Sequence, residues 1–206
     1  MSLPYVIAIR QCPASLSYII VMRNCHMSLS YVFRDHYTAM VTSASRAVGF
    51  KMRNCKNFSN LDVLKSLYFS LVRSRLEYAS VVWSPRERCH IDRIESVQRR
   101  YLKYLYLKQH NEYPSRGASH ELLLLQMEVQ SLGLRRRALD LCFLRSLVQG
   151  TADCSFLLNK LGFYVPRKNS KLKYTFYVES ARTDYNKYAP INRIYVEANN
   201  MLLDIF

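Results

Sequence analysis

The stretch LDVLKSLYFSLVRSRLEYASVVWSP, residues 61–85, decides the fold class. Its apolar side chains, among them Leu64, Leu71 and Val82, recur at spacings of three and four, which places them on one face of a helix. Asn60 can cap this helix by accepting a bond from an unpaired backbone N–H group, and the proline at its end stops it. We therefore expect a helix that carries this face through Val82, with Pro85 stopping or following it.

Helical patterns continue on both sides of this segment. Expected helices follow the caps Asp35, Asn60, Ser119 and Ser131, and others occupy 88–107 and 192–203. After Ser131 the inward positions include Cys142 and Leu147, and Gly150 ends the helix. Segments 163–165 and 174–178 look like short strands. The prediction is a mainly α fold: a helical bundle, an irregular C-terminal extension and a β-prone N-terminal repeat.

The N-terminal repeat has a unit of 13 residues. MSLPYVIAIRQCP and ASLSYIIVMRNCH are followed by a third copy that opens MSLSYVFRD and then diverges. The units are shorter than a solenoid repeat. They favour strands, so one reading is a small β array; the other is a translated DNA duplication attached to a real domain. The predicted division is therefore 1–34 for the repeat, 35–110 for the bundle and 111–206 for the extension.

The positive charge of the chain is concentrated in the predicted bundle. The 206 residues carry a net charge of +15. Segment 36–110 has fourteen Lys and Arg against five Asp and Glu, a surplus of nine. Tyrosines lie among these cations, a mixture that suits a phosphate backbone. An anionic membrane surface and a solvated face that binds nothing are the alternatives. No apolar run is long enough to span a bilayer.

Three other features receive a structural interpretation. The run Arg135-Arg136-Arg137 resembles a nuclear-localisation signal, but the preferred interpretation is a solvated helix face with at least one arginine turned toward an acid. The six cysteines have long, irregular spacings. We read them as scattered, reduced, buried thiols rather than as a disulfide framework. No secretory signal is evident at the start, so an intracellular location is expected.

Catalytic patterns are missing from the sequence. A polymerase or nuclease needs carboxylates that converge on divalent metal, whereas the acids here are single and dispersed, and Glu77 and Glu95 look structural. Cys89 and His90 are adjacent, and adjacent helical residues do not face one site, so neither a catalytic pair nor a zinc site is expected there. The prediction is a chain without enzymatic activity of its own, without a cofactor and without a small-molecule substrate.

One region resembles a known family. Residues 64–85, with the run Leu-Glu-Tyr-Ala-Ser-x-Val-Trp-x-Pro, and 90–102, with Ile-x-x-Ile-Glu-x-Val-Gln-Arg-Arg, resemble the segment downstream of the palm in non-LTR retrotransposon reverse transcriptases, most nearly the jockey-like elements of animals. Similarity in the same order extends over about 33–206. The resemblance implies a thumb, a helical bundle that grips the template–primer duplex, and the segment that follows it. The palm, with its Ala-Asp-Asp motif, is not in this sequence.

Two departures from the family stand out. Position 75 is usually aliphatic there, but Arg75 falls on the apolar helix face, where it must either extend outward or be buried at a cost of several kcal/mol. The 13-residue repeat replaces the family's strands before the first helix. Tyr68 and Trp83 are expected in the core. Both departures fit a decayed or truncated copy of an element.

The leading hypothesis is a non-catalytic fragment of an RNA-directed DNA polymerase that binds RNA–DNA or DNA duplex. The expected phosphate contacts are Arg73, Arg93, Arg99, Arg100 and Lys103. A second hypothesis is an inert remnant whose exposed apolar face makes it self-associate. A third is an enzyme subunit that pairs with a separate chain containing the palm.

Overall fold

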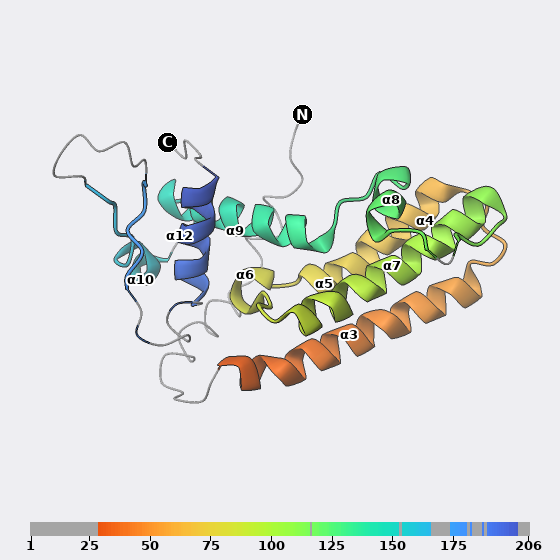
Figure 1. Cartoon of the computed structure of the whole chain (residues 1–206), viewed down its shortest axis with the longest axis horizontal. Helices are drawn as coiled ribbons and strands as arrows, with labels where there is room; N and C mark the ends of the chain where they lie inside the picture. The colour runs from red at the N-terminus through yellow and green to blue at the C-terminus, as the bar shows by residue number, and fades with distance from the viewer. Residues whose placement is uncertain are drawn as a thin grey trace. The chain divides into compact units, whose positions relative to one another are not determined.

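The computed structural model describes residues 29–115, 117–152, 154–165, 174–180, 182, 187 and 189–201. Most of them are helical, which confirms the mainly α fold (Figure 1). The helical elements are α3 (Leu29–Asn54), α4 (Leu61–Tyr68), η1 (Phe69–Arg73), α5 (Ser74–Glu77), α6 (Ser80–Trp83), α7 (Arg88–His110), α8 (His120–Gln126), α9 (Leu132–Val148), α10 (Ser155–Leu158) and α12 (Pro190–Asn200). Most of the repeat, residues 1–28, lies outside the described ranges.

The chain divides into two compact units. Leu29–Ser80 together with Pro85–Arg136 form one, which we call the bundle unit. Val81–Ser84 pack with the described residues after Arg136 in the other, the C-terminal unit. The structure therefore groups 111–136 with the bundle rather than with the C-terminal extension. Within the described ranges, no helix combines the length and apolar character needed to cross a bilayer.

The bundle unit is built around α7. Helix α3 runs beside α7 and also contacts η1 and α5, while α4 and α8 pack on α7 (Figure 1). Tyr68 and Trp83 are both buried, as expected. The rings of Tyr68 and Tyr101 stack with centroids 5.1 Å apart, and the Tyr101 hydroxyl donates to the Leu64 carbonyl at 2.9 Å. Aromatic stacking and a hydrogen bond thus join α4 to α7 in the core.

A π-helical turn keeps one row of side chains pointing inward. Leu64, Tyr68, Val72 and Leu76 are each four positions apart and are all fully buried. In an α-helix a spacing of four advances by more than one turn, so such a row drifts around the axis. The wider turn η1, in which Ser74 N–H donates to the Phe69 carbonyl, lies inside this row and offsets the drift.

The helix starting at Leu61 does not continue through Val82, so that prediction was wrong. The Asn60 cap is confirmed, because its side chain accepts from Asp62 N at 2.9 Å. Helix α5, however, ends at Glu77, and Ala79 adopts a left-handed conformation with φ of 52°. A residue with positive φ cannot propagate a right-handed helix, so the chain turns before α6 begins.

Helix α3 begins at Leu29, so the prediction that Asp35 caps it was also wrong. Asp35 is exposed inside the helix. The buried row of Tyr37, Met40, Ala44 and Val48 continues upstream through Phe33, whose ring centroid lies 6.2 Å from that of Tyr37. The helical periodicity therefore extends back into the third copy of the repeat.

The C-terminal unit has a core of its own. Leu144, Phe176, Ile194, Tyr195 and Ala198 form it, and the rings of Phe176 and Tyr195 stack at 5.2 Å. These residues come from α9, from α12 and from the segment that precedes α12 in the chain. This small cluster holds the irregular extension together.

The two short strands predicted in the extension reduce to one bridge between Phe163 and Phe176. The Asn199 side chain on α12 takes over part of the pairing that a strand would supply. It accepts from Thr175 N at 3.2 Å and from Phe176 N at 3.0 Å, and it donates to the Phe176 carbonyl at 2.9 Å. Because a helix satisfies this backbone, the segment does not need a further strand.

The other caps are confirmed, but the four cysteines within the described ranges are less buried than predicted. Ser119 accepts from Leu122 N at 3.2 Å, and the φ of Gly150 is 68° beyond the end of α9. Cys55 is buried, whereas Cys89 and Cys142 are exposed. The inward position expected for Leu147 is confirmed, but the one expected for Cys142 was wrong, because Leu144 and Leu147 of α9 face the core and Cys142 faces solvent.

Candidate nucleic-acid interface

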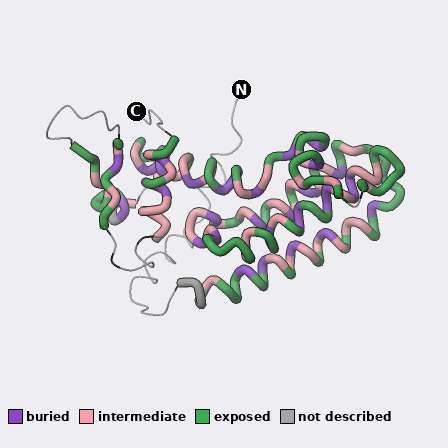
Figure 2. The backbone as a smooth tube through the Cα atoms, in the orientation of Figure 1, coloured by how far each residue is buried: buried purple, intermediate pink, exposed green. Residues whose placement is uncertain are grey.

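Helix α7 has one buried and one exposed face (Figure 2). Ile94, Tyr101 and Leu105 are fully buried, whereas Arg93 and Arg100 are exposed. The amphipathic pattern of α7 produces this division, since apolar residues recur at three and four positions and polar residues, many of them cations, fill most of the remainder. The helix therefore presents its cations to solvent while its apolar face builds the bundle core.

Four of the five predicted contacts share the exposed part of α7, and we call them the basic stripe: Arg93, Arg99, Arg100 and Lys103. At 3.6 residues per turn, Arg93, Arg100 and Lys103 fall within an arc of about 80°, and Arg99 lies about 40° beyond it. The three arginines are exposed and Lys103 is half-buried. Asp92 is exposed at the N-terminal end of the stripe, so the charge is most positive toward Lys103.

Arg73, the fifth predicted contact, lies in η1, and its side chain interacts with other residues of the protein. Its guanidinium carbon lies 4.0 Å from the centroid of the Phe69 ring, and its Nε is 3.9 Å from Glu77 Oε2. The side chain is only 16% exposed. Packing against an aromatic face and a carboxylate holds this arginine in place, so little of it is presented to solvent.

The reading of Arg135 and Arg136 as part of a solvated face was wrong. Both are buried, with 8% and 5% exposure. Arg135 makes two hydrogen bonds to the Glu77 carboxylate, one of them Nη2 to Oε2 at 2.9 Å. Arg137 alone of the three is exposed, and its Nε lies 3.4 Å from Glu197 Oε1. Burial of two charged groups is tolerated because each has an acidic partner.

Glu95 connects three elements of the bundle unit. Its Oε1 accepts from Gly133 N at 2.8 Å and lies 3.7 Å from Arg136 Nη2, while its Oε2 lies 3.4 Å from His120 Nε2. Burial alone would raise the pKa of Glu95. The hydrogen bonds from His120 and Gly133 and the charge of Arg136 outweigh it and hold this pKa below its usual value. The expectation that Glu77 and Glu95 are structural is thereby confirmed.

Arg75 extends outward from the apolar face on which it begins. Its Nη1 donates to Ser43 Oγ at 3.0 Å, and the residue is exposed. The side chain helps to line an open, mostly apolar groove of about 520 Å³ with Met40 and Tyr78. The Arg75 side chain was expected either to extend outward or to be buried, and its guanidinium group extends outward to solvent.

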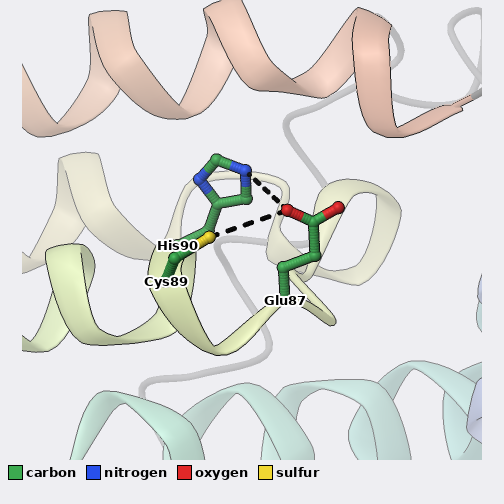
Figure 3. A group of neighbouring side chains, drawn as sticks. All are labelled: Glu87, Cys89 and His90. Atoms are coloured by element: carbon green, nitrogen blue, oxygen red, sulfur yellow. Dashed lines mark hydrogen bonds and ion pairs between the residues drawn. The ribbon is translucent and has the colours of Figure 1, made fainter.

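Cys89 and His90 meet at one carboxylate, contrary to the prediction that they would not face a common site. Figure 3 shows both reaching the same oxygen, Glu87 Oε2, which lies 3.3 Å from His90 Nε2 and 3.6 Å from Cys89 Sγ. Among the described residues, Glu87, Cys89 and His90 form the group in which three potential metal-ligand atoms lie close to one another. Glu87 precedes the first turn of α7, where the backbone is extended, and this conformation lets its side chain fold back over the turn.

Comparison with known proteins adds no relative. No protein-family model matches the sequence, and neither a curated protein nor a solved structure matches it significantly.

Proposed function

We propose that the chain is a non-catalytic fragment of a retrotransposon RNA-directed DNA polymerase whose bundle unit binds template–primer duplex through the basic stripe of α7. The resemblance of residues 64–85 and 90–102 to the thumb region supports the family. The surplus of cations in 36–110 supports the polyanionic partner. The proposed binding is tolerant of sequence, because arginines on one helix face would meet phosphates rather than base edges.

The observation that carries the proposal is the separation of charges in the bundle unit. Glu77 and Glu95 are directed inward to Arg135 and Arg136, where each pair cancels. Arg93 and Arg100 are directed to solvent, seven positions apart, which is about 10 Å along the helix axis. A rigid helix that holds two guanidinium groups at this separation can contact two phosphates of one duplex. We expect Arg73 to contribute least.

Fluorescence anisotropy of a labelled RNA–DNA hybrid, measured across a salt series, tests the proposal. The test variant is R93Q/R100Q, and the matched control is R145Q/R182Q, which removes the same charge from exposed residues outside the bundle unit. Loss of two phosphate contacts should make the negative slope of log K against log salt shallower by about 1.8. With the two proteins binding equally at 1 M salt, this change in slope makes the affinity of the variant about 60-fold weaker at 0.1 M salt.

The control separates a local contact from a general charge effect. If R145Q/R182Q weakens binding as much as R93Q/R100Q does, the interaction reflects net charge and not the basic stripe. If the unmodified chain binds without a salt slope, or does not bind at low salt, the proposal is refuted. A DNA duplex of the same sequence, titrated in parallel, measures the preference between the two nucleic acids.

Exposed leucines favour a second candidate function, self-association of an inert remnant. Leu122 and Leu125 on α8 are 57% and 76% exposed, and Leu134 at the start of α9 is 58% exposed. Apolar side chains of this size are expected to promote contact between copies. Light scattering over a range of protein concentrations tests this candidate without nucleic acid, and the variant L122Q/L125Q should restore a monomer. A constant monomer mass in the unmodified chain would exclude it.

A further inference from the structure

We propose that Glu87, Cys89 and His90 form a binding site for a zinc-class divalent transition metal. The ligand atoms are Glu87 Oε2, Cys89 Sγ and His90 Nε2, and water would complete a tetrahedron at the fourth position. This site is separate from the proposed nucleic-acid contacts and does not depend on them. It adds an activity, metal binding, that neither the charge pattern nor the family resemblance implies.

The spacing of the ligand atoms matches the edges of a zinc tetrahedron. Bonds of about 2.0 Å to oxygen and nitrogen and about 2.3 Å to sulfur give edges of about 3.3 Å for O···N and about 3.5 Å for O···S. The observed separations are 3.3 Å from Glu87 Oε2 to His90 Nε2 and 3.6 Å to Cys89 Sγ. All three atoms lie within 4.8 Å of one another. The remaining S···N edge of the tetrahedron is also about 3.5 Å, so closing it requires a shift of about 1.3 Å at most.

The kinds of donor atom select the metal class. Mg²⁺ and Ca²⁺ prefer oxygen ligands, whereas a thiolate together with an imidazole suits zinc and its neighbours in the first transition row. A thiolate and a carboxylate also neutralise the two charges of the ion. This balance is needed here because the exposed Arg88 and Arg93 lie on the same helix, where an uncompensated cation would be repelled.

The fold holds the least mobile ligand in place and leaves the others accessible. The His90 side chain is only 12% exposed, and its ring centroid lies 4.7 Å from that of Tyr37 on α3. Its backbone N–H donates to the Glu87 carbonyl at 3.0 Å, which fixes the turn that carries all three ligands. Cys89 is exposed and the Glu87 side chain is 54% exposed, so an ion can enter from solvent. An entering ion would therefore meet one ligand held by packing and two exposed ligands close to it.

Cobalt titration of the full chain, reduced and free of nucleic acid, tests the site. Co²⁺ replaces Zn²⁺ in tetrahedral sites, and a thiolate ligand gives it a charge-transfer band in the near ultraviolet. We expect one Co²⁺ per chain, with this band and intense visible bands of a tetrahedral ion. C89S should abolish the charge-transfer band, whereas C142S, which alters another exposed cysteine, should leave it unchanged. E87Q should weaken binding at least 10-fold, and excess Zn²⁺ should remove the cobalt bands.

Other outcomes overturn the proposal. A chain that shows no thiolate band, or a band that survives C89S, does not bind metal at this trio. An affinity that E87Q leaves unchanged excludes the three-ligand arrangement. Circular dichroism of each variant checks that the fold persists. A mass-spectrometric measurement gives a second readout, because Zn²⁺ should slow alkylation of Cys89 and not that of Cys142. Equal alkylation rates with and without Zn²⁺ would likewise refute the site.

Discussion

Replacing Glu77 by alanine should be among the most damaging single changes in the bundle unit. The Glu77 side chain is 13% exposed, and it pairs with the buried guanidinium of Arg135 through two hydrogen bonds. E77A would leave that guanidinium buried without its carboxylate. Removing one partner of a buried ion pair costs about 3–5 kcal/mol, because the remaining charge is neither solvated nor paired. Since whole domains are stable by only about 5–15 kcal/mol, this is a large share.

Removing both charges should cost much less than removing one. In E77M/R135M, apolar side chains of similar length fill the same volume, and such replacements of buried pairs are often neutral or stabilising. The remaining cost is the contact of Arg73 with Glu77, which spans 3.9 Å. The single variants E77M and R135M and this double variant form a cycle, in which we expect a coupling energy of about 1–3 kcal/mol. E128Q is the matched control. Glu128 is 86% exposed and lies 3.9 Å from Lys65, so its loss should change stability by less than about 0.5 kcal/mol.

Urea unfolding followed by far-ultraviolet circular dichroism measures these free energies. Fluorescence of Trp83, the one tryptophan, reports the C-terminal unit and shows whether the two units unfold together. Comparable m-values across the series are required for the comparison. The reasoning is refuted if E77A costs less than about 1 kcal/mol, or if the double variant loses the sum of the two single losses.

Three further changes test other contacts. The pKa of Glu95 is held below its ordinary value of 4.5, so its ionised carboxylate stabilises the folded chain fully at neutral pH. This contribution to the free energy of unfolding is lost as pH falls below about 4.5. The urea midpoints of the unmodified chain and of E95Q should therefore differ at neutral pH and converge in acid. N60A should cost about 1 kcal/mol in urea unfolding by removing the cap of α4, and an unchanged midpoint would contradict that role. A79G should raise the free energy of unfolding by up to about 1 kcal/mol, because glycine adopts the φ of 52° at position 79 without strain. A138G, inside α9, should lower it by a similar amount. The opposite order of stabilities would refute backbone strain at Ala79.

Local signals in the sequence predicted much of the fold. Asn60, Ser119 and Ser131 each accept a backbone N–H bond at the start of a helix, and all three were predicted as caps. Helix α7 is predicted almost to its ends, because its apolar spacing is regular over its whole length. These features depend on residues within a few positions of each other, so one sequence contains the information they require.

Features set by distant residues could not be predicted. The pairing of Glu77 with Arg135 joins positions 58 apart, and neither has a local pattern that identifies the other. The left-handed turn at Ala79 has no glycine or asparagine to indicate it. The trio of Glu87, Cys89 and His90 was missed for a different reason. Helical geometry separates adjacent side chains, but the extended residue before the helix brings its carboxylate to both.

The division of the arginines between the core and the surface also explains where the charge of the bundle unit lies. A buried ion pair has no net charge, so Arg135 and Arg136 with their glutamates contribute nothing to the field outside the protein. Because Arg135 and Arg136 lie outside segment 36–110, they neutralise two of its five acids and use none of its fourteen cations. A polyanion would meet the whole cationic surplus of that segment at long range but the basic stripe only on contact. For this reason R93Q/R100Q, compared with an equal loss of charge elsewhere, separates a built interface from a merely basic protein.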